Sequence, residues 1–124
     1  MNKQQTVLLV DDDQRNIFAL SAVLKARGYT VFSAANIRDA YTILEGPGQI
    51  SIILMDMMMP DMDGYEAIPL IKNDARFASI PVIAVTAQAM AGDKEKSLAA
   101  GADGYVAKPV DIDLLTTMID EHLK

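Results

Sequence analysis

The stretch Ile52-Ile53-Leu54-Met55-Asp56 decides the fold, and Met57-Met58-Met59-Pro60-Asp61-Met62-Asp63-Gly64 follows it directly. Four apolar residues that run without a break into a turn are typical of a parallel strand covered on both faces. Because Pro60 and Gly64 favour a loop, we expect Asp56 at the carboxyl end of the strand. Open α/β folds bind their ligands at that edge of the sheet. A single aspartate there is more often only a polar strand end, so its companions elsewhere in the chain decide its role.

The composition is that of one globular domain spanning residues 1–124. Apolar residues make up 51% of the chain and charged residues 23%, which is ordinary for a globular protein. The formal net charge of -6 argues against direct binding to nucleic acid. The chain has no cysteine, its first residues lack the apolar core of a signal peptide, and no apolar run reaches the length of a membrane span. We therefore expect a cytoplasmic domain that does not contact a membrane.

Apolar runs and helical patterns alternate along the whole chain. Besides 52–56, short apolar runs predict strands at residues 7–10, 30–33, 82–85 and 104–107. Helical spacing and the capping residues Asn36 and Asp111 predict helices at 14–27, 36–45, 63–73 and 89–100, and a last helix after Asp111. Gly28 and Gly101 are expected to end helices, and Pro69 to bend the third helix or delay its start. The helical side chains expected to face the core are Ile17, Leu20, Leu24, Ala40, Ile43, Leu44, Leu114, Leu115, Met118 and Ile119.

Five strands that alternate with five helices predict an α/β fold, a doubly wound parallel sheet with helices on both faces. The flavodoxin-like fold of this class has the strand order 2-1-3-4-5, and its site lies between strands 1 and 3. In that order Asp11 and Asp12, which follow the first strand, meet Asp56 in one crevice. Thr86 and Lys108 follow the fourth and fifth strands and line the same edge.

This group of side chains has the chemistry of a magnesium and phosphate site. Clustered carboxylates repel each other, by about 3 kcal/mol for a pair roughly 5 Å apart at an effective dielectric constant near 20. A divalent cation removes that repulsion, and Mg²⁺ is commonly held by one or two carboxylates with water and phosphate oxygens. Lys108 can neutralise a phosphoryl oxygen, and Thr86 can donate a hydrogen bond to another.

Five short motifs in this order resemble the receiver domain of two-component response regulators, and the resemblance covers the whole chain. The motifs are Asp11-Asp12, Asp56 with Met59-Pro60-x-Met62-Asp63-Gly64, Thr86-Ala87, Gly101-Ala102 and Lys108-Pro109. The segments 88–93 and 107–111 look most like receivers of hybrid sensor kinases and of stand-alone single-domain regulators.

The resemblance implies a role for each site residue. Asp56 would accept a phosphoryl group from a histidine kinase or a histidine phosphotransfer protein. Asp12, Asp56 and the backbone carbonyl of Met58 would bind Mg²⁺ directly, and Asp11 mostly through water. Thr86, Ala87 and Lys108 would bind the phosphoryl group, Thr86 and Tyr105 would form the switch, and the Lys108–Pro109 peptide bond would be cis.

The same resemblance implies a regulatory domain rather than an enzyme. Phosphorylation would change partner binding on the surface formed by the helix at 89–100, the strand at 104–107 and the last helix. The output protein is not identified by the sequence. His122 is the only histidine and has the setting of a solvated helix end, so the phosphodonor must lie outside residues 1–124 or be a small molecule.

Other functions of the same fold remain open at this point. Asp11-x-Asp13 is similar to the nucleophile motif of magnesium-dependent aspartyl-phosphate phosphatases, although Arg15 stands where those enzymes generally have Thr or Val. Asp13 can also be only a helix cap. A flavin module lacks support because no Ser/Thr/Gly-rich loop follows the first strand. Tyr105, judged by its position alone, could equally be ordinary strand packing.

Overall fold

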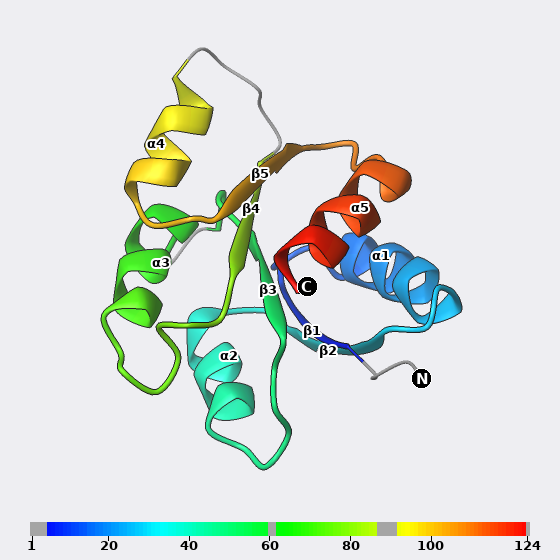
Figure 1. Cartoon of the computed structure of the whole chain (residues 1–124), viewed down its shortest axis with the longest axis horizontal. Coiled ribbons are helices and arrows are strands. Elements are labelled where there is room, and N and C mark those ends of the chain that lie inside the picture. The colour runs from blue at the N-terminus through cyan, green and yellow to red at the C-terminus, as the bar shows by residue number, and fades with distance from the viewer. Residues whose placement is uncertain (1–4, 60–61, 87–91, 124) are drawn as a thin grey trace.

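The computed structural model describes residues 5–59, 62–86 and 92–123, in which five strands alternate with five helices (Figure 1). The strands are β1 (Thr6–Val10), β2 (Thr30–Ala34), β3 (Ile52–Asp56), β4 (Val82–Thr86) and β5 (Gly104–Ala107). The helices are α1 (Gln14–Ala26), α2 (Ile37–Leu44), α3 (Gly64–Lys72), α4 (Asp93–Ala99) and α5 (Ile112–His122). Across the described ranges, no helix is long and apolar enough to span a membrane.

All neighbouring strands are parallel, and their order is β2-β1-β3-β4-β5, which confirms the predicted flavodoxin-like topology. The register aligns the strand ends that carry the candidate residues. Val10 pairs with Met55, and Asp56 pairs with Val85. Thr86 pairs with Ala107, the residue before Lys108. The last residues of β1, β3, β4 and β5 therefore lie along one edge of the sheet.

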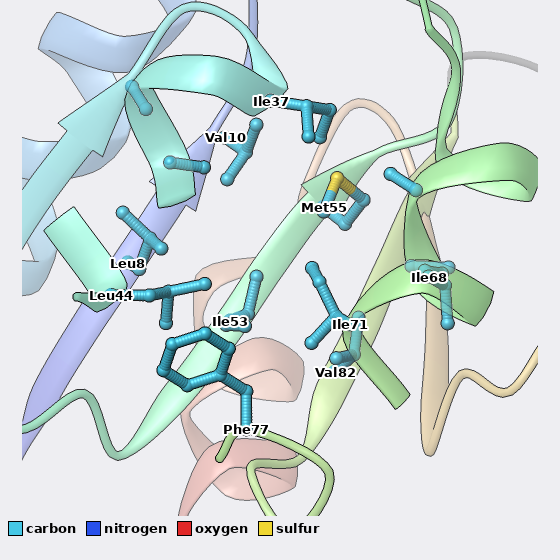
Figure 2. Close-up of a cluster of buried hydrophobic side chains, with 14 of the residues drawn as sticks. Leu8, Val10, Ile37, Leu44, Ile53, Met55, Ile68, Ile71, Phe77 and Val82 are labelled. Atoms are coloured by element: carbon cyan, nitrogen blue, oxygen red, sulfur yellow. The ribbon is translucent and has the colours of Figure 1, made fainter. Parts of the chain in front are cut away.

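The sheet separates two apolar clusters, with α1 and α5 on one face and α2, α3 and α4 on the other (Figure 1). Alternate strand residues supply the two clusters because successive side chains in a strand point to opposite faces. Ile53 and Met55 pack with Ile68 and Phe77 in the cluster shown in Figure 2. Ile52 and Leu54 belong to the other cluster. Burial on both faces explains why β3 is apolar throughout until Asp56.

Side-chain caps fix the beginnings of most helices. Asp13 caps α1 by accepting hydrogen bonds from the amides of Arg15 and Asn16, at 3.0 and 3.4 Å. The predicted caps Asn36 and Asp111 accept from the amides of the third helical residues of α2 and α5. Gly28 follows α1 with φ +98°, a left-handed conformation that favours glycine and ends the helix as expected.

One predicted core residue is wrong, because Leu114 has 53% of its surface exposed. The buried residues of α5 are Leu115, Thr116 and Ile119. Leu114 precedes Leu115 by one residue and is thus turned about 100° around the helix. The apolar residues of α5 occupy a wider arc than the sheet can cover, so the side chain at the margin faces solvent.

One helix start agrees with the prediction and one differs from it. α3 begins at Gly64, next to the predicted Asp63, and continues through Pro69 to Lys72, so Pro69 does not delay its start. A capping box between Asp63 and Glu66 fixes that start before the proline is reached. α4 begins at Asp93 rather than at residue 89, because Gly92 has φ +89°. Residues 89–91 of the predicted helix lie outside the described residues.

Candidate functional site

Three carboxylates meet where β1 and β3 end. Ligand oxygens of Asp11, Asp12 and Asp56 all lie within 4.8 Å of one another. Asp56 is the last residue of β3, and Asp11 is fixed after β1 by a hydrogen bond from its amide to the carbonyl of Ala34, at 3.0 Å. Asp11 and Asp56 are almost fully buried, whereas Asp12 is exposed at the mouth of the site. The topology thus brings together the acidic residues that the sequence singled out.

The carboxylate of Asp11 is held by donors from three places in the chain. Its Oδ1 accepts a hydrogen bond from the amide of Asp13 at 2.9 Å. Its Oδ2 accepts from Asn16 Nδ2 and, at 3.3 Å, from Lys108 Nζ. Sequence reasoning missed Asn16. Its position directly before the buried Ile17 places it beside the buried face of α1 but does not by itself indicate a contact with Asp11.

Asp56 lies in a different balance of charges. Its Oδ1 accepts a hydrogen bond from the Met58 amide at 3.0 Å, and its Oδ2 is 3.8 Å from Lys108 Nζ. Burial raises the pKa of Asp56 to about 6, and the negative charge of Asp11 adds to the increase. The Met58 hydrogen bond and Lys108 act in the opposite direction but do not cancel it. Asp56 is therefore a buried carboxyl group that releases its proton at a higher pH than an ordinary aspartate.

Lys108 is the cation that faces both buried carboxylates. Its amide donates to the carbonyl of Thr86 at 2.7 Å, which places the residue directly at the end of β5. Its ammonium group forms ion pairs with Asp11 and Asp56. The Lys108–Pro109 peptide bond is cis. One lysine therefore serves two acids, and the site with Asp12 has an excess of negative charge.

The remaining predicted residues lie around this centre. Thr86 is buried at the end of β4. Tyr105 is half-buried on β5 and packs against the apolar cluster shared by α2 and α3, and burial and nearby Asp93 raise its pKa. Met58 has its side chain exposed while its amide binds Asp56. Ala87, Pro60 and Asp61 lie outside the described residues.

Gly64 explains why the loop after Asp56 needs a glycine. A Cβ atom at this position would lie 2.2 Å from the sulfur and 3.0 Å from the Cα of Met57. Because Met57 is fully buried and its amide bonds to the carbonyl of Val85 at 2.9 Å, the loop cannot move away easily. Gly64 thus permits the first turn of α3 to pack directly on the residue that follows the candidate acceptor.

The donor set fits Mg²⁺ better than a softer metal. All the charged ligand groups are carboxylate oxygens, which hard cations prefer, and no cysteine exists in the chain to favour zinc. The two buried acids, Asp11 and Asp56, share one lysine, and the exposed Asp12 adds a third negative charge, so a divalent cation would balance the remaining charge. The exposed position of Asp12 leaves that side open to water and to a phosphate group.

Fold and site together define a doubly wound α/β domain that carries acidic side chains at the switch point of its sheet. The chain belongs to the response regulator receiver domain family, whose model matches residues 7–120. It is therefore a receiver domain of two-component signalling rather than a classical enzyme.

Individual relatives show the same kinship. The chain is 31% identical over 119 residues to the polar-differentiation response regulator DivK of Brucella anthropi, covering 96% of both chains. It is 35% identical over 115 residues to the response regulator Rre1 of Synechocystis, covering 92% of this chain but only 49% of that protein. A crystal structure of the receiver domain of a sensor histidine kinase from Pseudomonas aeruginosa, with a magnesium ion coordinated in its active site cleft, is 34% identical. It superposes with a TM-score of 0.86, and the match covers 98% of each chain.

Proposed function

We propose that this domain is a phosphorylation switch of a phosphorelay, in which Asp56 accepts a phosphoryl group from a histidine-phosphorylated protein. The observation that supports the proposal best is the position of Asp56, buried at the end of β3 with one oxygen directed toward Lys108. In the transfer the P–N bond of phosphohistidine breaks as a P–O bond to Asp56 forms. The electron pair of the broken bond remains on the imidazole nitrogen. Catalysis of such a transfer consists mainly of positioning and charge stabilisation.

Each nearby side chain has a proposed part in this reaction. Asp12, Asp56 and the Met58 carbonyl would hold Mg²⁺, with Asp11 acting through water. A bound Mg²⁺ supplies positive charge that offsets the charge of the phosphoryl oxygens. Lys108, which faces both Asp11 and Asp56, would turn to a phosphoryl oxygen, and Thr86 and Ala87 would bind the others. The magnesium-bound receiver of the Pseudomonas kinase supports this choice of metal.

The output would arise on the surface of α4, β5 and α5. Movement of Thr86 toward the phosphoryl group would open space for Tyr105 and shift an existing equilibrium between two states. Leu98 on α4 and Leu114 on α5 are 41% and 53% exposed, so this surface offers apolar groups to an output protein. Phe18 on α1, 78% exposed, offers another such group to the phosphodonor. The proposed partners are proteins of the cytoplasm, with no direct contact to nucleic acid or membrane.

A phosphatase that uses Asp11 as nucleophile has less support. Both oxygens of Asp11 already accept hydrogen bonds, Oδ1 from Asp13 and Oδ2 from Asn16 and Lys108. An attack through Oδ2 would disturb the bonds to Asn16 and Lys108. The family of the chain also favours Asp56 as the acceptor.

The proposal is tested by phosphorylation in vitro. Incubation with acetyl phosphate and Mg²⁺ should add one phosphoryl group to the wild-type protein, as measured by intact mass. Asp56→Asn should gain none, because the amide oxygen is a poor nucleophile. Reduction of the acyl phosphate with borohydride identifies the modified residue, which should be Asp56. Stoichiometric labelling of Asp56→Asn, or a label on Asp11, would contradict the assignment.

A further inference from the structure

Asn16 is not part of the sequence motifs that identified the site, yet its side chain contacts Asp11, the most buried carboxylate of the site. Asn16 lies in the first turn of α1, and its Nδ2 donates a hydrogen bond to Oδ2 of Asp11. The helix that carries it is firmly placed, because Asp13 caps its start and Ile17 and Leu20 are buried against the sheet. Asn16 thus offers a neutral donor from a fixed position.

Asn16 shares the Oδ2 atom of Asp11 with Lys108. The lysine ammonium is 3.3 Å from this oxygen and 3.8 Å from Oδ2 of Asp56. It therefore divides its charge between two carboxylates. If Lys108 turns to a phosphoryl group, as its proposed role requires, the buried Asp11 loses its cation. A buried carboxylate left without partners is costly, so another donor must remain.

We propose that Asn16 is a positioning residue of the magnesium site, which orients Asp11 and keeps its Oδ2 hydrogen-bonded when Lys108 leaves. This role rests on the proposed function of the site. The amide of Asp13 holds Oδ1 from the other side, so the two donors together fix the plane of the carboxylate. Asp11 can then present a constant geometry to the metal and its water in both states of the switch. Residues that orient ligands in this way commonly contribute 10- to 100-fold to metal affinity.

The experiment compares two leucine substitutions on the same helix. Asn16→Leu keeps the approximate size of the side chain and removes the donor. Gln14→Leu is the matched control, because Gln14 is an exposed residue of the same turn and has no side-chain hydrogen bond to the described residues. The dissociation constant for Mg²⁺ is measured by isothermal titration calorimetry for both variants and for the wild type. Asn16→Ala is measured as well, in case leucine perturbs the fold.

We expect Asn16→Leu and Asn16→Ala to bind Mg²⁺ about 10- to 100-fold more weakly than the wild type, and Gln14→Leu to bind normally. At saturating Mg²⁺, both Asn16 variants should still be phosphorylated more slowly by acetyl phosphate, since Lys108 would then be the one side-chain donor left to Asp11 among the described residues. Unchanged or tighter Mg²⁺ binding in both Asn16 variants would overturn the inference. A wild-type protein that neither binds Mg²⁺ nor is phosphorylated would instead refute the proposed function itself.

Discussion

At the scale of single residues, the two buried acids of the site differ in the hydrogen bonds and positive charge that offset their negative charge. Asp11 receives hydrogen bonds from an amide, an asparagine and a lysine, whereas Asp56 has the Met58 amide and a more distant share of Lys108. Burial and the negative charge of Asp11 raise the pKa of Asp56 to about 6, and the Met58 hydrogen bond and Lys108 offset only part of that increase. The two aspartates, at the ends of adjacent strands, therefore have different electrostatic surroundings.

The raised pKa of Asp56 predicts a pH-dependent stability in the absence of metal. A carboxyl group with a higher pKa in the folded protein binds its proton more tightly when folded, so its contribution to stability is lost as the pH rises from about 4 through about 6. Asp56→Asn keeps a neutral side chain at every pH. In EDTA, its free energy of unfolding relative to wild type should therefore rise over that interval, on the order of 2–3 kcal/mol. Urea unfolding at pH 4, 5, 6 and 7 measures the difference, and a constant difference would contradict the prediction.

Residues at strand ends could be predicted from the sequence, and Asn16 could not. Parallel pairing alone brings Asp11, Asp56 and Lys108 to one edge, since each follows an apolar run of similar length. The role of Asn16 depends on the rotation of α1 and on a side-chain rotamer. The prediction that Leu114 faces the core was wrong for a related reason. The pattern of apolar residues does not show how wide an arc of the helix the sheet covers.

At the scale of secondary-structure elements, α4 is held less firmly than its neighbours. Its N-cap residue is Gly92, so no side chain caps the start of the helix. Ser97 is the one buried residue of α4 among those described. Lys96 Nζ lies 4.5 Å above the ring of Tyr65 and provides a link to α3. Few buried contacts and a weak cap are typical of segments that open or move at low cost. These features suit the role proposed for α4 in the switch, and they also explain why its start was predicted less well than the starts of the capped helices.

Ser97 offers a direct test of this weakness. Its hydroxyl is fully buried and, within the ranges that the structure describes, has no hydrogen-bond partner. Removal of an unpaired buried polar group should stabilise the fold, so Ser97→Ala should raise the free energy of unfolding by about 1 kcal/mol. Thr116→Val is the control. The Thr116 hydroxyl is also buried but donates a hydrogen bond to the Ile112 carbonyl at 3.0 Å, so its removal should lower the free energy of unfolding. Urea unfolding of both variants decides, and a destabilised Ser97→Ala would show that the hydroxyl is bonded after all.

At the scale of the whole molecule, charge is distributed unevenly between the two edges of the sheet. After α2 and α3, the exposed Arg76 pairs with both Glu45 and Asp74. At the opposite edge Asp11 and Asp56 share Lys108, and Asp12 adds a third carboxylate, in a chain with a net charge of -6. The parallel topology and right-handed connections produce this arrangement by placing strand ends together. The alternation of elements made the topology predictable, while the balance of charges required the side-chain positions.

The excess charge predicts opposite effects of Asp12→Ala with and without metal. In EDTA the variant should melt at a slightly higher temperature than the wild type, since it loses the repulsion between Asp12 and the two buried acids. Because Asp12 is exposed, solvent limits the increase in the free energy of unfolding to about 1 kcal/mol or less. With Mg²⁺ at ten times its dissociation constant, the wild type should gain about 1.4 kcal/mol, and the variant little or nothing. Thermal unfolding of both proteins in both buffers is the measurement. A full Mg²⁺ response in Asp12→Ala would place the metal elsewhere.

The exposed thioether of Met58 places an oxidisable group two residues from the proposed acceptor, Asp56. Met55, Met57 and Met59 are buried, whereas Met58 is 55% exposed and is the only methionine of the described ranges with an exposed side chain. Peroxide should therefore convert Met58 to its sulfoxide before these neighbours, adding a polar oxygen two residues from Asp56. Peptide mass spectrometry after mild peroxide treatment would show the order of oxidation, and Met58→Leu should protect the rate of acetyl phosphate labelling. In a cell under oxidative stress, oxidation of Met58 would then alter the protein directly beside the proposed phosphorylation site.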